Sequence, residues 1–447
     1  MKHLNMSISK NKLTALCIGL SLWLVGCGGE DKGSKVSFLP ADGQVTLVTA
    51  TPTSVNAYAA ARFLEQASWG PTPNSVAEVQ RLGIEGWIDQ QLAMKSSDLN
   101  APNYVIDYEM NNRAAQDLAF SWFRARFNDV GLGGADQLRQ RMAWALYNFI
   151  VLGQIGQALG QVEYYNMMQR GALGKFPDLI RAVSLNPTMG AFLNNNENTA
   201  GKPNENYARE LMQLFTVGLT MLSSDGAILR DAQGRSIEAY TQADVIMATK
   251  ALSGWQNDWK QTPKSDGENA RTPMRPRQNA NAHDATQKTL LGKVIPAGQT
   301  IQQDLESVIS ILATHPNTAP FVVKRLIQSL VSSDPSPEYI ARVGYVFIQT
   351  GGDLGKVAKA ILMDPEARAG DDPKYQFPRI GKIKEPILFH MSFLRALGCK
   401  SAVVSRNNSS NLYDAQQNPY QALSVFGFFA PNHKAPESLT PAPEQKL

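Results

Sequence analysis

The sequence has few cysteines and few charged residues. Of its 447 residues only 3 are cysteine, and Asp, Glu, Lys and Arg together make up 18%. Three cysteines cannot build the disulfide framework of a small secreted scaffold. The low charge, together with 43% hydrophobic residues, excludes a chain that is disordered by composition and a long coiled coil. The chain is therefore long and apolar enough to bury a large core.

Several motifs of well-known enzyme and metal sites are also missing. The sequence contains no Gly-Lys-Ser/Thr phosphate loop, no His-Glu-x-x-His, no Gly-x-Ser-x-Gly and no Cys-x-x-Cys. Their absence argues against a P-loop nucleotidase, a zincin protease and a nucleophile-elbow hydrolase. It also argues against zinc-ribbon, thioredoxin-like and c-type haem sites. The sequence identifies no cofactor.

The N-terminus has the pattern of a bacterial lipoprotein signal peptide. Three lysines precede an uncharged run at 13–25, which is too short to cross a bilayer as a helix. The run ends in Leu-Val-Gly-Cys at 24–27, which resembles a lipobox. We predict a signal peptide over 1–26 and lipidation of Cys27. An ordinary signal peptide is the alternative.

The predicted lipid gives an expected location and an expected partner. Several acyl chains anchor a protein stably, and Gly28 after the cysteine favours the outer membrane over retention in the inner one. Removal of residues 1–26 takes away three lysines and no acidic residue, so the formal net charge falls from +4 to +1. With so small a charge and no basic stripe, we expect attachment to the membrane through the lipid and no nucleic-acid partner.

The rest of the chain divides into a tether and a long body. Residues 27–57 are rich in Gly, Ser and Thr and predict a flexible tether. Beyond them, apolar side chains recur at helical spacing, as at Leu138, Met142 and Leu146. We therefore predict a single helical domain over 58–447.

Signals for β-strands are few. Two turns containing glycine lie within 222–240 and predict a small β-hairpin insertion there. Residues 256–300 are polar and carry Pro, Asn and Gly, which predicts a long irregular excursion. Directly between these segments, Thr241 and Asp244 have the spacing of a capping box and predict the start of a helix. The expected fold class is all-α, a multi-helix body with a minor β-hairpin.

The first candidate site is the polar run Asn-Glu-Asn-Tyr-Ala-Arg-Glu at 204–210. On a helix, Glu205 and Arg209 are four residues apart in the favourable order, and Asn204 suits the N-cap position. As a site, Asn204 and Glu205 would help to bind a ligand, while Arg209 holds an anionic group and Glu210 acts as acid or base. The alternative is a capped surface helix with a structural ion pair.

The second candidate site is the adjacent pair His283 and Asp284. A histidine beside a carboxylate suits a divalent metal ion or proton transfer, so we name both as candidate catalytic residues and metal ligands. His315 is a candidate binding residue. The alternatives are structural: Asp284 caps a turn, His283 bonds a backbone carbonyl, and His315 ends a helix.

Nine segments of the sequence carry motifs that occur together in one protein family: residues 61–72, 204–211, 240–245, 251–255, 283–292, 315–321, 364–368, 384–386 and 424–426. In their order they resemble a bacterial protein family known as domain of unknown function 1800. The resemblance implies an exported, largely helical protein and no established activity. One departure concerns Phe215, because many relatives have a histidine at the matching position, so a metal held there in relatives would have lost a ligand here.

Two function hypotheses from different classes follow. The first is a lipid-anchored protein of the cell envelope whose helical body binds a partner protein or an envelope ligand. The second is a hydrolase or other metal-dependent enzyme built from Arg209, Glu210, His283 and Asp284. The second hypothesis requires that these side chains meet in one cleft.

Overall fold

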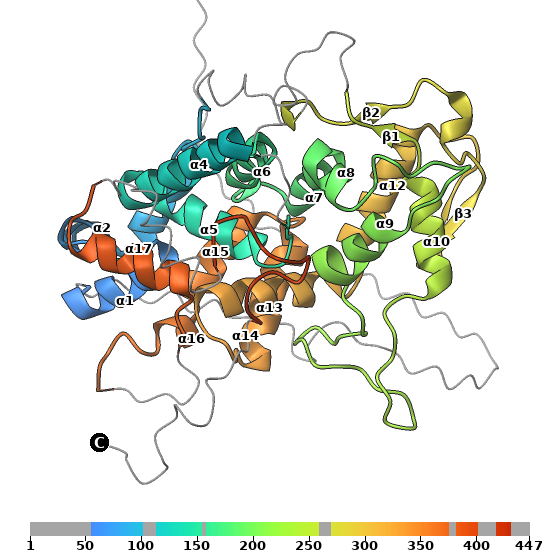
Figure 1. Ribbon diagram of the computed structural model, residues 1–447. Coiled ribbons are helices and arrows are strands. Elements are labelled where there is room, and N and C mark those ends of the chain that lie inside the picture. The colour runs from blue at the N-terminus through green and yellow to red at the C-terminus, as the bar shows by residue number, and fades with distance from the viewer. Residues whose placement is uncertain are drawn as a thin grey trace, which may run out of the picture. The chain divides into compact units, whose positions relative to one another are not determined.

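The computed structural model describes residues 55–101, 113–153, 158–258, 270–374, 381–400 and 417–430. The chain divides into two compact units, Met1–Ala41 and Asp42–Leu447, and every described residue belongs to the second. The predicted signal peptide, Cys27 and most of the predicted tether lie outside the described residues. The described part is mostly helical, with two small sheets, which confirms the expected fold class (Figure 1).

Seven helices form the first half of the described chain. Two of them begin with side-chain caps: the Asn56 side chain caps the first, and Thr72 and Ser75 form a capping box at the second, where Pro73 is the first helical residue. The helices are α1 (Ala57–Ala67), α2 (Pro73–Leu92), α4 (Arg113–Gly133), α5 (Gln137–Tyr147), α6 (Ala158–Gly171), α7 (Phe176–Leu185) and α8 (Pro187–Phe192).

Eight α-helices and one π-helical turn follow in the described second half. The capping box predicted at Thr241 and Asp244 is confirmed, since each side chain accepts a hydrogen bond from the other's backbone N–H. The elements are α9 (Asn206–Glu210), the π-helix η1 (Leu211–Thr216), α10 (Gln242–Ala251), α12 (Ile301–Ala313), α13 (Thr318–Leu330), α14 (Pro337–Gln349), α15 (Leu354–Met363), α16 (Pro365–Arg368) and α17 (Pro386–Ala396).

The described strands lie in a different place from the one predicted. Segment 222–240 forms only isolated bridges, such as Arg230 with Ser236. The regular pairs fall in the segment predicted to be irregular, which also holds the 3-10 helix η2 (Ala280–Ala282). The strands are β1 (Trp255–Gln256) with β2 (Arg275–Pro276), and β3 (Lys288–Leu290) with β4 (Lys293–Ile295).

A tight turn explains the second of these hairpins. Leu291 and Gly292 both have positive φ angles, 49° and 72°, as a two-residue turn between twisted strands requires. In β3 the side chains of Lys288 and Leu290 point inward and that of Thr289 points outward. The strand is three residues long, too short for its alternation to stand out in a polar sequence.

The later helices return to pack on the earlier ones (Figure 1). Helix α15 packs on α1 and α2, α13 packs on α5, and α17 packs on α4. Between them lies a cluster of buried aromatic rings, with centroids 6.0 Å apart for Trp69 and Trp144 and 4.2 Å apart for Tyr147 and Tyr420. These contacts join residues far apart in sequence, so one core holds both halves of the described chain.

No helix in the described ranges combines the length and the apolar composition that crossing a membrane would require.

Gly70 marks a close approach between the α1–α2 turn and α17. Its φ angle is 129°, a Cβ placed on it would lie 2.6 Å from the Cα of Ser392, and its carbonyl accepts a 2.8 Å hydrogen bond from Arg395 Nε. A side chain at this position therefore meets both backbone strain and a backbone clash.

We expect Gly70→Ala to lower the free energy of unfolding by about 2–4 kcal/mol, because strain and overpacking add. Denaturant unfolding of the purified protein measures the change. Gly133→Ala at the end of α4 is the control, since its added Cβ meets nothing within 4 Å, and it should change stability by less than about 0.5 kcal/mol. Equal stability of the two variants would contradict this account.

Candidate functional site

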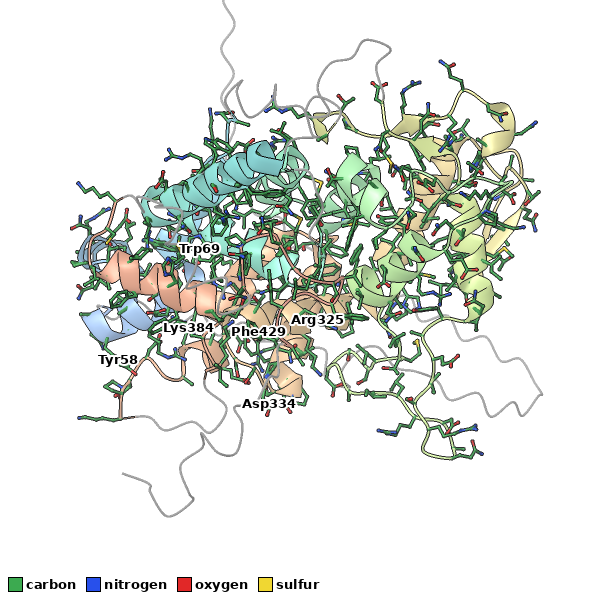
Figure 2. All side chains as sticks on the ribbon, in the orientation of Figure 1. Tyr58, Trp69, Arg325, Asp334, Lys384 and Phe429 are labelled. Atoms are coloured by element: carbon green, nitrogen blue, oxygen red, sulfur yellow. The ribbon has the colours of Figure 1, made fainter. Side chains whose placement is uncertain are left out.

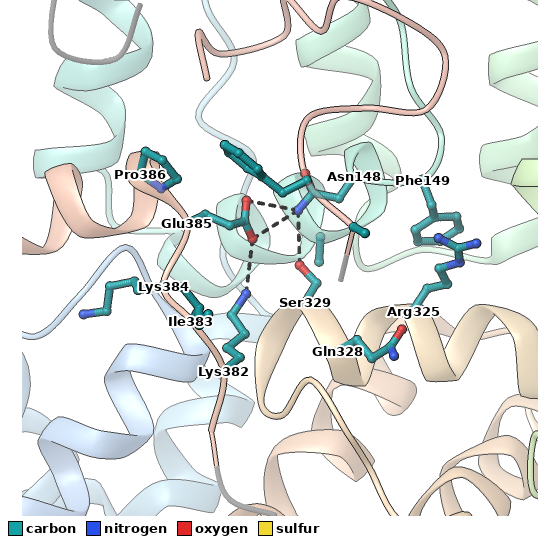
Figure 3. Close-up of a pocket in the computed structure, with 13 residues that line it drawn as sticks. Asn148, Phe149, Arg325, Gln328, Ser329, Lys382, Ile383, Lys384, Glu385 and Pro386 are labelled. Atoms are coloured by element: carbon teal, nitrogen blue, oxygen red, sulfur yellow. Dashed lines mark hydrogen bonds and ion pairs between the residues drawn. The ribbon is translucent and has the colours of Figure 1, made fainter. Parts of the chain in front are cut away.

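A pocket of about 250 Å³ lies where α5, α13 and the segment that leads into α17 meet (Figure 3). The pocket-lining Arg325, Lys384 and Phe429 are marked together in the middle of Figure 2. The polar and charged side chains of the lining are those of Asn148, Arg325, Gln328, Ser329, Lys382, Lys384 and Glu385, and the apolar ones are those of Ala145, Phe149, Ile383, Pro386, Phe429 and Ala430.

The local sequence explains how Glu385 comes to face this pocket. A proline disfavours helical backbone in the residue before it, and Glu385, which precedes Pro386, has φ −59° and ψ 148°. The chain therefore enters α17 from an extended segment. This segment is held at one end by a hydrogen bond from Ser333 N to the carbonyl of Gly381, and in its middle by an ion pair of Lys384 with Glu65 at 2.7 Å.

The Glu385 carboxylate is surrounded by donors from three parts of the chain. It accepts hydrogen bonds from Trp144 Nε1 at 3.0 Å and Gln417 Nε2 at 2.9 Å, pairs with Lys382 Nζ at 3.1 Å, and lies 3.4 Å from Asn148 Nδ2. Burial acts to raise the pKa of Glu385. The charges of Lys382 and Arg141 and these hydrogen bonds outweigh it, so the pKa lies below its usual value.

Two cations beside Glu385 are, like it, largely shielded from solvent. The Lys382 side chain is only 14% exposed, and desolvation lowers its pKa from 10.5 to about 8 although Glu385 opposes the shift. Arg141 is fully buried and donates to the carbonyl of Ser329, while its Nε and Nη1 have no hydrogen-bond partner among the described residues. A lysine with such a pKa is partly neutral near physiological pH and able to give up or take up a proton.

Arg325 differs from the other cations at the pocket. Burial lowers its pKa, and no acidic group offsets the effect. Within the described part of the chain its only specific contact is with the ring of Phe321, 5.0 Å from the guanidinium carbon. A half-buried guanidinium without a carboxylate partner is a strong donor group for an anion that enters the pocket.

The residues predicted from the 204–210 run form one surface group. The Asn204 side chain accepts from the backbone of Asn206, and Arg209 pairs with Glu205 at 2.7 Å, both being more than a third exposed. Such a pair contributes little to stability. Burial raises the pKa of Glu210, offset in part by Arg209, and its Oε2 has no described hydrogen-bond partner.

The residues predicted at 283–284 form a second group. His283 Nδ1 lies 3.0 Å from the carbonyl of Ser253, and its Nε2 lies 3.2 Å from Asp304 Oδ2. Ser253 lies beside the ring in a Ser–His–Asp order, but its hydroxyl is buried and donates to the Lys250 carbonyl, so it is not presented to a substrate. These contacts match the structural alternative for His283.

Asp284 makes its hydrogen bonds mainly within its own loop. Its carboxylate accepts from Thr286 N at 2.9 Å and lies 3.5 Å from Lys250 Nζ. Burial would raise the pKa of Asp284. The bonds from Thr286 and the charges of Lys250 and Lys288 act more strongly and lower it.

Helix α10 separates the two groups. Arg209 and Glu205 both bond Gln242 at its first residue, whereas Asp284 pairs with Lys250 near its last. Eight residues of helix correspond to about 12 Å. His315 bonds neither group in the described ranges. Its Nδ1 accepts a hydrogen bond from Asn317 N, and burial lowers its pKa, which the charge of Asp244 near the start of α10 partly opposes.

The structure thus brings Asn204, Glu205, Arg209 and Glu210 together, and His283 with Asp284, but shows no contact between these sets in the described ranges. Nor does any group of three His, Cys, Asp or Glu side chains in those ranges have the geometry to hold a metal ion. Phe215, the departure noted in the family resemblance, is fully buried and packs on Tyr207.

The sequence did not identify the pocket residues as a site. Lys384, Glu385 and Pro386 carry part of the family resemblance, but Lys382 and Arg325 stand in no motif. Their burial depends on α5, α13 and residue 417 coming together. The available signal was weak: a Lys-x-Lys-Glu-Pro run at a helix start.

The buried lysine makes stability depend on pH in a known direction. The unfolded chain keeps the Lys382 proton up to about pH 10.5, while the folded chain releases it near 8, so between these values the unfolded state binds more protons. The contribution of Lys382 to stability therefore rises with pH across this window.

We expect the free energy of unfolding of the wild type, minus that of Lys382→Met, to increase by about 2–3 kcal/mol from near pH 7 to near pH 10. Denaturant titrations at both pH values measure it. Subtracting one free energy of unfolding from the other cancels the contributions of all other titrating groups, which both proteins share. Parallel pH dependences would show that Lys382 keeps its ordinary pKa.

Comparison with known proteins gives a family and nothing further. A family model described as protein of unknown function (DUF1800) matches residues 62–442. Neither a curated protein nor a solved structure matches the chain. Because the matched residues cover most of the sequence and include both halves of the helical body, the chain belongs to the DUF1800 family.

Proposed function

We propose that this protein is a lipid-anchored binding protein of the bacterial cell envelope, and that the pocket between α13 and α17 takes a small anionic group. The observation that carries the proposal is the Arg325 guanidinium, which faces the pocket with no acidic partner in the described ranges. The carboxylate of the lining, Glu385, is already bound by Lys382, Trp144 and Gln417. The pocket therefore has cationic capacity left for a ligand.

The location in the envelope is supported by the N-terminal sequence. Three lysines, an uncharged run at 13–25 and the lipobox-like 24–27 precede Cys27 in the order of a lipoprotein signal. The lipid would hold the helical body at the membrane, and Gly28 favours the outer membrane. An envelope ligand suits the pocket better than a partner protein, because about 250 Å³ accommodates a small group and not a protein surface.

The enzyme hypothesis has less support. Its four residues, Arg209, Glu210, His283 and Asp284, belong to two groups near opposite ends of α10. Each group has contacts that explain it without a substrate. Within the described ranges, no contact between the two groups supports the combined site of the hypothesis.

We expect Arg325→Gln to weaken binding of acetate or inorganic phosphate by tenfold or more, since a charge-assisted hydrogen bond is worth about 1.5–3 kcal/mol. Isothermal titration calorimetry of the full-length protein measures the change. Arg230→Gln removes the same charge outside the pocket, at an exposed arginine whose side chain donates to the carbonyl of Gly234, and should leave binding unchanged. If the two variants bind equally well, the pocket proposal fails.

We expect Cys27→Ala to remove the lipid and release the body from the membrane fraction. Metabolic labelling with an alkyne fatty acid, followed by fractionation of inner and outer membranes, reads out both effects. Cys399→Ala is the matched control, because it removes the only cysteine that remains outside the predicted signal and anchor. Labelling that survives Cys27→Ala would rule out the proposed anchor.

A further inference from the structure

An exposed apolar stripe runs along α17 away from the pocket. Phe389, Phe393 and Leu397 are 63%, 54% and 64% exposed, and the rings of the two phenylalanines are stacked with centroids 6.4 Å apart. The three residues follow one another at steps of four, so they share a face of the helix. Pro386, which lines the pocket, lies on the same face at the start of α17.

This stripe is additional to the face that anchors α17 in the core. Ile387, Leu388 and Met391 are buried and pack the helix into the main cluster. A helix that is apolar on its outer face as well is unusual at a protein surface, where large apolar side chains are normally scattered singly. The stripe is therefore a candidate contact surface.

The pocket offers cationic groups, and the stripe offers apolar side chains. The pocket holds the guanidinium of Arg325, which has no acidic partner among the described residues, and the largely buried amine of Lys382. Its lining also includes Ile383 and Phe429, 56% and 40% exposed. Its volume of about 250 Å³ suits a head group but not a whole drug-sized molecule. A longer ligand would have to continue outside, and α17, which carries the apolar side chains, begins at the pocket with Pro386 and extends for 11 residues, about 16 Å.

We propose that the ligand of this protein is a long-chain fatty-acid anion, with its carboxylate in the pocket beside Arg325 and its hydrocarbon chain along Phe389, Phe393 and Leu397. This inference rests on the proposed function, because it names the class of anionic ligand. The charge of the pocket selects a carboxylate over a neutral alcohol, and the length of the stripe selects a long chain over a short one.

Binding is expected to strengthen with chain length. Each methylene buried against apolar surface favours binding by up to about fourfold. The stripe covers only one side of the chain, so we expect about twofold per methylene. Acetate, octanoate and dodecanoate, titrated into the full-length protein below their micelle concentrations, should bind in that order of increasing affinity. Dodecanol should bind at least tenfold more weakly than dodecanoate.

Two sets of variants separate the head group from the chain. Phe389→Ser and Phe393→Ser, at the end of the stripe nearer to the pocket, should reduce the affinity for dodecanoate at least fivefold and leave that for acetate unchanged. Ile348→Ser on α14, where the side chain is 61% exposed, is the matched control and should change neither. Arg325→Gln should weaken acetate and dodecanoate alike.

The outcomes are distinguishable. If all carboxylates bind equally and the stripe variants behave as the control does, the chain-length inference is wrong and the pocket still binds an anion. If no carboxylate binds and Arg325→Gln has no effect, the proposed function fails as well. If the stripe variants abolish self-association or binding to phospholipid vesicles but leave dodecanoate titrations unchanged, the stripe covers a second copy or a bilayer, and the inference is overturned.

Discussion

A single buried carboxylate, that of Glu385, holds together parts of the chain that are far apart in sequence. It takes hydrogen bonds from Trp144 on α5 and from Gln417 near the end of the described chain, 241 and 32 residues away. An ionised carboxylate that leaves water must regain equivalent interactions from the protein. That requirement fixes the positions of Lys382 and Asn148 beside it, and with them the path by which the chain enters α17.

The same requirement shapes the pocket. Once Lys382 and Arg141 stabilise the charge of Glu385, the surroundings are dominated by cations, and Arg325 at the opposite wall finds no acidic partner in the described ranges. The aromatic core supports this arrangement from behind, because the Trp144 ring that donates to Glu385 also packs against Trp69 and Tyr147. The polar network and the packed core are thus one unit, and the pocket lies on its rim.

The helices could be predicted from local sequence to a large extent. The capping box at Thr241 and the proline at the start of α17 give start signals that act within one turn, so no distant contact is needed to recognise them. The strands could not be predicted in the same way. The β3–β4 hairpin is three residues on each side, and it is stabilised by packing of β3 against α10 and by burial of Lys288 with Asp304.

In the candidate site, too, some features follow from local sequence and others only from contacts between distant segments. The sequence by itself determined the family, the predominance of helix, and the pairing of Glu205 with Arg209, since residues four apart on a helix meet whatever the rest of the chain does. It did not determine the N-cap of α9, which is Glu205 and not the expected Asn204. Only the tertiary structure decided that His283 pairs with Asp304 and not with Arg209, and that Glu385, Lys382 and Arg325 share a pocket. Proximity between distant segments, and the desolvation that changes a pKa, are properties of packing, and no local pattern of residues contains them.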